Sequence, residues 1–101
     1  RGILSTIYLD IKSESSVKKI QLILKKFYQK NQFVKILKND TLISTNDVCN
    51  TNNCLISVCK TKYKNKIIIL SAIDNLIKGG AGQAIQNMNI KFNFKNYESL
   101  K

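Results

Sequence analysis

The chain has 101 residues, with 17 Lys and Arg residues against 6 Asp and Glu residues, a formal net charge of +11, and neither His nor Pro. This length suits one small domain or part of a larger one, and a hydrophobic content of 44% argues against wholesale disorder. Without His, the chain contains no imidazole base, no Cys–His pair and no His-ligated metal. We therefore expect no metal site.

The basic charge has two explanations. A small module that binds nucleic acid or an acidic surface would carry such a charge, because clustered cations are the footprint of phosphate binding. However, 16 of the 17 basic residues are Lys and only Arg1 has the guanidinium fork that reads base edges. Sixteen Lys, fifteen Ile and twelve Asn residues, all with A/T-rich codons, indicate compositional drift instead. We favour drift, and expect neither nucleic acid nor a membrane as partner.

The first expected element is a strand over residues 2–11. Apolar and polar residues alternate there with the period of two that is typical of a half-buried strand. The face that carries Ile3, Ile7 and Leu9 is the more apolar, so we expect it to meet the core.

A helix is expected over residues 13–30. Ser13 or Ser15 can cap its amino end, and Glu14 suits the positive end of the helix dipole. Apolar residues at a spacing of three or four predict the buried face, and lysines occupy most of the opposite side. These apolar residues are Val17, Ile20, Ile23 or Leu24, Phe27 and Tyr28. A basic amphipathic helix can also lie on a membrane, but we favour a helix that covers a sheet.

Three further strands are expected over residues 33–37, 54–60 and 66–73. A polar segment with Asn-rich turn signals precedes the second strand, and residues 62–65 form the turn between the second and third. The run 67–70 is continuously apolar, which is typical of a central strand buried on both faces. The sequence thus predicts an α+β fold in which helices cover a mixed or antiparallel sheet.

The three cysteines, Cys49, Cys54 and Cys59, form neither a disulfide framework nor a zinc pattern. Their number is odd and their C-x4-C-x4-C spacing lacks a fourth ligand. In a strand, Cys54 and Cys59 would face opposite sides because their offset is odd. We expect small buried side chains in a reducing cytosol, with a reactive thiol among them as the alternative.

A glycine-rich turn follows the last strand and leads into a second helix. Gly79, Gly80 and Gly82 allow close backbone approach, and the start of the helix would offer free N–H donors to an anion or a ligand. The spacing fits neither a P-loop nor G-x-G-x-x-G, so close packing of helix against strand is an equal alternative. Ala84, Ile85, Met88 and Phe92 are spaced for one face of this helix.

Residues 71–89, SAIDNLIKGGAGQAIQNMN, are closely similar to the carboxyl-terminal signature of N-acetyl-gamma-glutamyl-phosphate reductases. The opening RGILSTIY resembles the Arg-Gly-Ile-x-x-Thr-x-Tyr strand of that family. Between them, Ser44-Thr45-x-Asp47-Val48 and Asn52-x-Cys54 fall where the family has matching residues. The resemblance therefore spans nearly the whole chain.

The resemblance implies an NADPH-dependent reductase of arginine biosynthesis that converts N-acetyl-glutamyl 5-phosphate to N-acetyl-glutamate 5-semialdehyde in the cytoplasm. Such an enzyme is related to aspartate-semialdehyde and glyceraldehyde-phosphate dehydrogenases, and has a Rossmann domain followed by an α+β catalytic and dimerisation domain. Residues 1–101 would be the carboxyl-terminal part of this second domain, and the full-length protein would be a homo-oligomer.

The resemblance also implies which functional residues this chain lacks. The family's Asn-Pro-Gly-Cys nucleophile motif and its catalytic His have no counterpart here, and none of the three cysteines matches the nucleophile. We therefore expect no catalytic residue within the chain and no reductase activity from the chain alone.

A few ligand-binding positions remain by resemblance. Gly79, Gly80, Gly82 and Gln83 would lie on the cofactor side, with Gln83 placed to hydrogen-bond the nicotinamide carboxamide of NADP. Arg1 would position the phosphate or carboxylate of the substrate. Asp74 and Asn75 are expected to shape the turn, since such side chains commonly bond nearby backbone. Gly80 departs from the family, which usually has Ala there.

Overall fold

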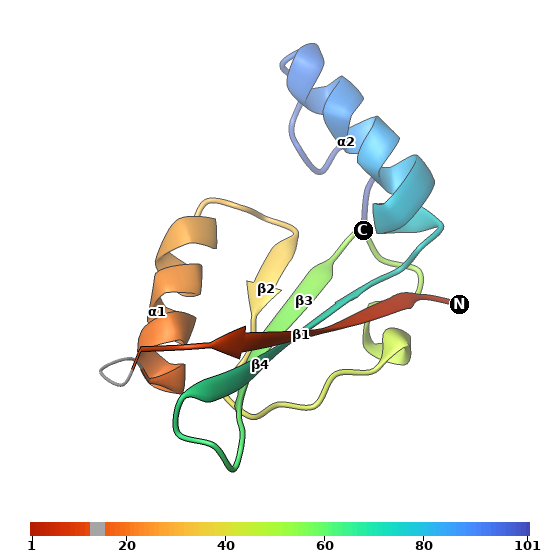
Figure 1. The fold of residues 1–101 in the computed structure, drawn as a ribbon. Coiled ribbons are helices and arrows are strands. Elements are labelled where there is room, and N and C mark those ends of the chain that lie inside the picture. Colours follow the sequence, from red (N-terminus) through yellow and green to blue (C-terminus); the bar gives the residue numbers. More distant parts are fainter. Residues whose placement is uncertain (13–15) are drawn as a thin grey trace.

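A computed structural model describes residues 1–12 and 16–101 and contains two helices and four strands, connected by turns (Figure 1). The elements in chain order are β1 (Ile3–Asp10), α1 (Val17–Tyr28), β2 (Val34–Ile36), a 3-10 turn (Thr45–Val48), β3 (Cys54–Lys60), β4 (Lys66–Ile73), a π-helical turn (Ile77–Ala81) and α2 (Gly82–Lys91). The predicted bounds of β3 and β4 are confirmed to the residue, and β1 and β2 are each one residue shorter at both ends.

The strands form one mixed sheet in the order β1-β4-β3-β2. β4 pairs antiparallel with both β1 and β3, and β2 pairs parallel with β3. The amino ends of β1, β2 and β3 therefore meet the carboxyl end of β4 at one end of the sheet. The predicted α+β class and mixed sheet are confirmed.

Helix α1 covers one face of the sheet over β2 and β3 (Figure 1). Ser16 caps it by accepting a hydrogen bond from the backbone N–H of Lys19 (3.2 Å), while the predicted caps Ser13 and Ser15, with Glu14, lie outside the described residues. The buried residue of the helix is Gln21, whose amide donates to the carbonyl of Leu37. Of the two alternatives Ile23 and Leu24, Leu24 is half-buried and Ile23 is exposed, so the helix turns the Leu24 side to the sheet. The predicted burial of Phe27 is wrong, because this side chain is exposed.

On the opposite face of the sheet, the segment between β2 and β3 supplies the cover. Ile43 and Val48 from this segment pack with Ala72 of β4 as a buried apolar cluster. The 3-10 turn that carries Val48 was not predicted; the backbone N–H of Ser44 donates to the Asp47 carboxylate (2.7 Å) and closes its start. This segment therefore supplies core residues although most of its sequence is polar.

The prediction that the apolar face of β1 meets the core is wrong. All eight residues of β1 are exposed, and Ile7 retains 43% of its surface. β1 is an edge strand of the sheet, and α1 packs on β2 and β3 at the opposite edge (Figure 1). For the same reason only Ile67 of the apolar run 67–70 is fully buried, although β4 is central in the sheet as predicted.

Helix α2 projects away from the sheet (Figure 1). Its predicted apolar face is wrong, because Ala84, Met88 and Phe92 are exposed and Ile85 is only half-buried. The buried side is polar instead: Gln86 faces the sheet end, and Asn89 donates to the carbonyl of Glu98 (3.0 Å) in the folded-back tail. In the part of the chain that the structure describes, neither helix is long and apolar enough to cross a membrane.

Candidate functional site

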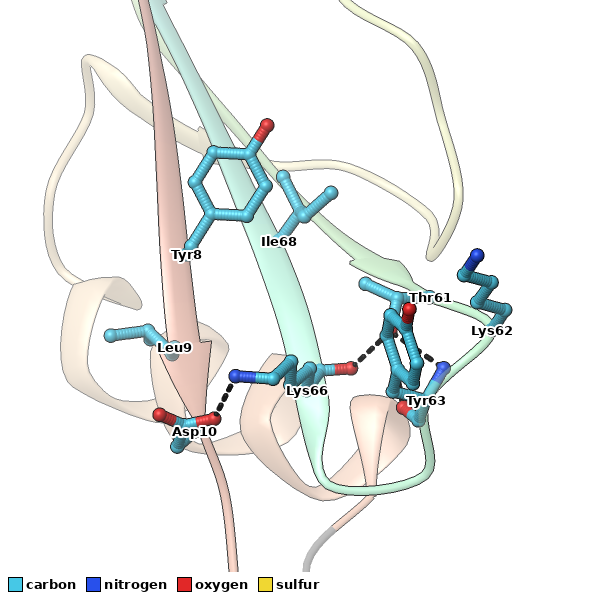
Figure 2. Close-up of a pocket in the computed structure, with 8 residues that line it drawn as sticks. All are labelled: Tyr8, Leu9, Asp10, Thr61, Lys62, Tyr63, Lys66 and Ile68. Carbon is cyan, nitrogen blue, oxygen red and sulfur yellow. Dashed lines mark hydrogen bonds and ion pairs between the residues drawn. The ribbon is translucent and has the colours of Figure 1, made fainter.

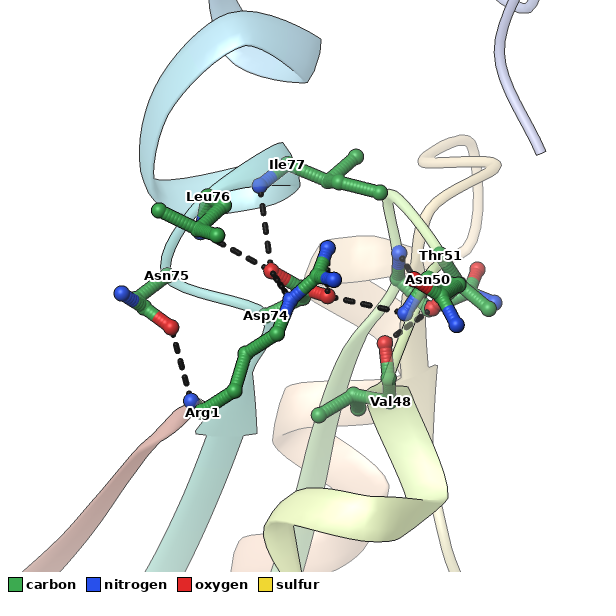
Figure 3. A network of polar contacts seen from close by, with 10 residues as sticks. Arg1, Val48, Asn50, Thr51, Asp74, Asn75, Leu76 and Ile77 are labelled. Atoms are coloured by element: carbon green, nitrogen blue, oxygen red, sulfur yellow. Dashed lines mark hydrogen bonds and ion pairs between the residues drawn. The ribbon is translucent and has the colours of Figure 1, made fainter.

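The residues singled out in the sequence gather at the end of the sheet where β1 begins and β4 ends (Figure 3). Asp74 follows β4 directly, and its side chain has no exposed surface. A buried carboxylate is stable only where donors surround it. The contacts of Asp74 therefore define the architecture of this site.

Both oxygens of the Asp74 carboxylate are bonded (Figure 3). Oδ1 accepts from the backbone N–H groups of Leu76 (2.8 Å) and Ile77 (3.1 Å) in the following turn. Oδ2 accepts from the backbone N–H of Asn50 (2.8 Å) and lies 2.9 Å from Nη2 of Arg1. One side chain thus joins the start of β1, the loop before β3 and the turn after β4.

These contacts shift the ionisation of Asp74. Burial by itself raises the pKa of a carboxyl, because it penalises the charged form. The three backbone N–H donors and the Arg1 guanidinium act in the other direction, and together they lower the pKa of Asp74 from 3.8 to about 2. Asp74 is therefore ionised at neutral pH, and it acts as an acceptor rather than as a proton donor.

Asn75 connects the same turn to the first strand. Its Oδ1 accepts from the backbone N–H of Gly2 at 2.7 Å. Gly2 has a φ of +121°, and a Cβ on it would lie 2.5 Å from Cβ of Thr45. Only glycine suits this position, since both the dihedral and the close approach exclude a side chain. Asp74 and Asn75 shape the turn, as the sequence predicted.

The turn after Asp74 is a π-helical turn that runs directly into α2. The N–H groups of Gly79, Ala81 and Gly82 bond to the carbonyls of Asp74, Leu76 and Ile77. These donors are therefore occupied, and the expectation of free N–H groups at the start of the helix is wrong for them. An anion at this place would have to be bound by side chains or by the exposed edge of the turn.

The three glycines of the turn have two different environments. Gly79 and Gly80 are exposed, and a Cβ on Gly80 would come no closer than 3.4 Å to the carbonyl of Asn75. Gly82 is buried, and its Cβ would lie 2.5 Å from Oδ1 of Asn52 and 2.6 Å from Cγ2 of Ile77. Close packing thus explains Gly82, whereas the other two leave the outer edge of the turn open.

Gln83 lies at the start of α2 and is half-buried. Its Nε2 donates to Oδ1 of Asn87 (2.9 Å), one helical turn further on. This is a helix-surface contact between neighbours, which contributes only about 0.2–0.5 kcal/mol and is readily exchanged for another partner. The amide is therefore available to a ligand.

Arg1 lies beside the turn, but its guanidinium is already engaged with Asp74 through Nη2 (2.9 Å) and Nε (3.3 Å). The side chain keeps 38% of its surface, so its remaining N–H donors face outward. The substrate role of Arg1 stays a prediction.

Sequence reasoning missed the layer beneath the turn. Asn52 Nδ2 (3.0 Å) and Lys78 Nζ (2.7 Å) both donate to Oε1 of Gln86. All three residues fall within the stretches that resembled the reductase signature, and this position in the motif was the available signal. Cys54 and Cys59 lie on opposite faces of β3 as predicted, and all three thiols are free.

Two cavities lie near the sheet ends. One of about 280 Å³ lies between Gly82 and the folded-back tail, next to the turn. Another of about 330 Å³ lies at the far end of the sheet, where Lys66 bonds Asp10 at 2.6 Å beside Tyr8 and Tyr63 (Figure 2). The far cavity contains none of the predicted site residues. Among the described residues, no group of three or more His, Cys, Asp or Glu side chains could hold a metal ion.

Comparison with known proteins identifies the family. The model of the semialdehyde dehydrogenase dimerisation domain matches residues 1–75, three quarters of the chain, up to and including Asp74 and Asn75. The chain belongs to this family. The α+β architecture with a mixed sheet agrees with such a domain.

Individual similar proteins match nearly the whole chain, including the glycine-rich turn that follows residue 75. An N-acetyl-gamma-glutamyl-phosphate reductase of Clostridium botulinum is 50% identical over 99% of this chain, and one of Halothermothrix orenii is 44% identical over 100%. One of Vesicomyosocius okutanii is 47% identical over 91%. The chain spans 29%, 29% and 26% of these three relatives. It is similar to their carboxyl-terminal region, which confirms the resemblance seen in the sequence.

Proposed function

We propose that this chain is the carboxyl-terminal part of the catalytic and dimerisation domain of an NADPH-dependent N-acetyl-gamma-glutamyl-phosphate reductase. The reaction takes the acyl phosphate, NADPH and a proton to N-acetyl-glutamate 5-semialdehyde, NADP⁺ and phosphate. The observation that carries the proposal is the meeting of two reductase-like stretches at one carboxylate: Asp74 binds Arg1 and the backbone of Leu76.

The residues at the turn fit the nicotinamide end of the cofactor. Gly79 and Gly80 are exposed and present backbone without a Cβ, so a flat ring can approach closely. The Gln83 amide carries both a donor and an acceptor, which matches the carboxamide of nicotinamide. When bound, NADPH supplies the hydride. This chain's part is to orient that ring and to exclude water beside it.

Arg1 completes the proposed site on the substrate side. Asp74 holds the guanidinium at 2.9 Å, which fixes one edge of the fork and leaves the other edge for a phosphate or carboxylate oxygen. An Arg held in this way loses little additional side-chain freedom when it binds an anion. The nucleophile, the general base and the Rossmann domain belong to other parts of such a reductase, so we expect the 101-residue chain alone to be inactive.

Self-association of the full-length protein in the cytoplasm is the remaining part of the proposal. The matching family model is that of a dimerisation domain. Exposed apolar side chains on β1 and α1, such as Ile3, Ile7 and Phe27, offer surface that a larger assembly would bury.

The experiment uses the full-length protein that carries this chain. Purified protein should oxidise one NADPH and release one phosphate for each acyl phosphate consumed. Gln83→Ala should raise KM for NADPH by about 2- to 10-fold or lower kcat, because a lost hydrogen bond to a neutral ligand group is worth about 0.5–1.5 kcal/mol. The control is Lys91→Ala, an exposed change at the other end of α2.

Three results decide among the alternatives. No oxidation of NADPH in the presence of acyl phosphate refutes the reductase proposal. Normal oxidation with unchanged kinetics in Gln83→Ala refutes only the role of Gln83. Binding of DNA or RNA that weakens steeply with salt would instead support the basic-module explanation of the charge.

A further inference from the structure

Lys78 lies in the glycine-rich turn before α2, and its side chain extends to the second turn of that helix. Its Nζ donates to Oε1 of Gln86 at 2.7 Å, although the two residues lie eight positions apart. The same oxygen accepts from Nδ2 of Asn52 at 3.0 Å. A single amide oxygen therefore joins the turn, the second turn of α2 and the segment that leads into β3.

The ammonium group of Lys78 is held on its other side by an aromatic ring. Nζ lies 5.5 Å from the ring centroid of Phe33, which is only 5% exposed and directly precedes β2. Burial lowers the pKa of Lys78, and a smaller coulombic effect of the Cys54 side chain acts in the opposite direction. Lys78 is thus a partly desolvated cation between the ring and the amide, where cation–π attraction is strongest.

Asn52 forms the floor of this layer. Its side chain is fully buried, and its backbone N–H donates to the carbonyl of Lys101 (2.6 Å). Its Oδ1 lies where a Cβ on Gly82 would come within 2.5 Å. The first residue of α2 therefore rests directly on the Asn52 amide.

These contacts matter because α2 has little other support on the sheet side. The helix projects from the sheet end (Figure 1). Its apolar residues Met88 and Ile90 are exposed. The contacts of α2 with the sheet end lie in its first two turns, at Gly82 and Gln86, and Asn89 adds the contact with the tail. Those two turns carry Gln83, and they continue directly from the exposed Gly79 and Gly80.

We propose that Lys78, Gln86 and Asn52 are positioning residues, which set the rotation of α2 and thereby place Gln83 and the open edge of the turn against the nicotinamide ring. This inference rests on the proposed function, because it assigns a purpose to the layer beneath the proposed cofactor site. None of the three residues touches the cofactor. They act through the backbone of the turn.

The test uses the full-length protein and compares two changes at one position. Gln86→Leu removes the shared acceptor, while Gln86→Glu keeps an oxygen for both donors and adds a charge opposite Lys78. Gln86→Leu should raise KM for NADPH by about 10-fold, since misplacement of a positioning group by about 1 Å costs up to 100-fold in rate. Gln86→Glu should remain within about threefold of the wild type, because charge-assisted hydrogen bonds replace the neutral ones.

A matched pair of lysine changes provides a second arm. Lys78→Met keeps most of the unbranched apolar stem and removes the cation, and Lys91→Met makes the same change on the exposed end of α2. We expect Lys78→Met to raise KM for NADPH about as much as Gln86→Leu does, and Lys91→Met to leave it unchanged. KM for the acyl phosphate should change less than KM for NADPH in every variant.

The possible failures can be told apart. If the wild type is active and Gln86→Leu has wild-type constants, the positioning role is overturned and the reductase proposal stands. A fall in the melting temperature of Gln86→Leu with no change in KM for NADPH also overturns it, since the contacts would then be only structural. If the wild type shows no reductase activity, the reductase proposal and the positioning role that rests on it both fall.

Discussion

Arg1 and Asp74 lie 73 positions apart in the sequence, and Nη2 of the first is 2.9 Å from Oδ2 of the second. The Asp74 side chain is fully buried, while the Arg1 side chain keeps 38% of its surface. The pair therefore has an inner, structural partner and an outer partner that a ligand can reach. This asymmetry places a fixed cation at the rim of the site, next to a turn that the same carboxylate stabilises.

The charge of Asp74 should make stability depend on acidity. Because the pKa of Asp74 falls from 3.8 to about 2 on folding, its ionised form stabilises the folded chain at any pH above 3.8. This contribution is lost as the pH falls from 3.8 through about 2. Asp74→Asn should therefore lower the urea midpoint at neutral pH, and the difference from the wild type should shrink at a pH close to 2. A constant difference across that range would contradict the prediction.

Gly82 and Gly80 offer a matched pair for the packing of the turn. Gly82→Ala places a Cβ 2.5 Å from Oδ1 of Asn52 and 2.8 Å from the carbonyl of Ile77, so we expect destabilisation by about 1–3 kcal/mol despite the better helix propensity of Ala. Gly80→Ala meets only the Asn75 carbonyl at 3.4 Å, and should change stability far less. Urea unfolding of both variants measures the difference. Equal effects would show that the contact with Asn52 does not govern the turn.

Gly2 is a second position where only glycine fits. Its φ of +121° and the 2.5 Å approach of a Cβ to Thr45 predict that Gly2→Ala destabilises the chain by more than about 1 kcal/mol. The hydrogen bond from the backbone N–H of residue 2 to Asn75 should weaken at the same time, and faster exchange of that amide in the variant would report this. Unchanged exchange at that amide would contradict this prediction.

The start of α1 depends on one side chain. Ser16 Oγ accepts from the N–H of Lys19 at 3.2 Å, so Ser16→Ala should cost about 1 kcal/mol. Ser16→Asp keeps an acceptor and adds a negative charge at the positive end of the helix dipole, so its stability should equal or exceed that of the wild type. Denaturant midpoints of the two variants test the cap, and a similar loss in both would show that the hydrogen bond contributes little.

The fold was predictable where the local pattern decides it. β3 and β4 are bounded by polar turn residues and carry dense apolar residues, and the sequence predicts both to the residue. The exposure of the apolar faces of β1 and α2 was not predictable, because among the described residues neither face is covered by another element. An alternating pattern shows which side of a strand is more apolar, but it cannot show whether anything packs there.

The site was predictable in part. The resemblance identified the turn, and the expectation that Asp74 and Asn75 shape it was right. The bonded N–H groups at the start of α2 could not be foreseen, because a π-helical turn has no sequence signature comparable to a helix cap. The junction of Lys78, Gln86 and Asn52 depends on side chains brought together by tertiary structure, and spacing alone does not reveal it.

In the proposed reductase, the open edge of the turn at Gly79, Gly80 and Gln83 faces the cofactor. The most direct test of this placement is amide hydrogen exchange of the full-length protein with and without NADPH. We predict slower exchange across residues 79–83 when NADPH is bound, and no change at the far end of the sheet around Lys66. Unchanged exchange at residues 79–83 under saturating NADPH would contradict the account.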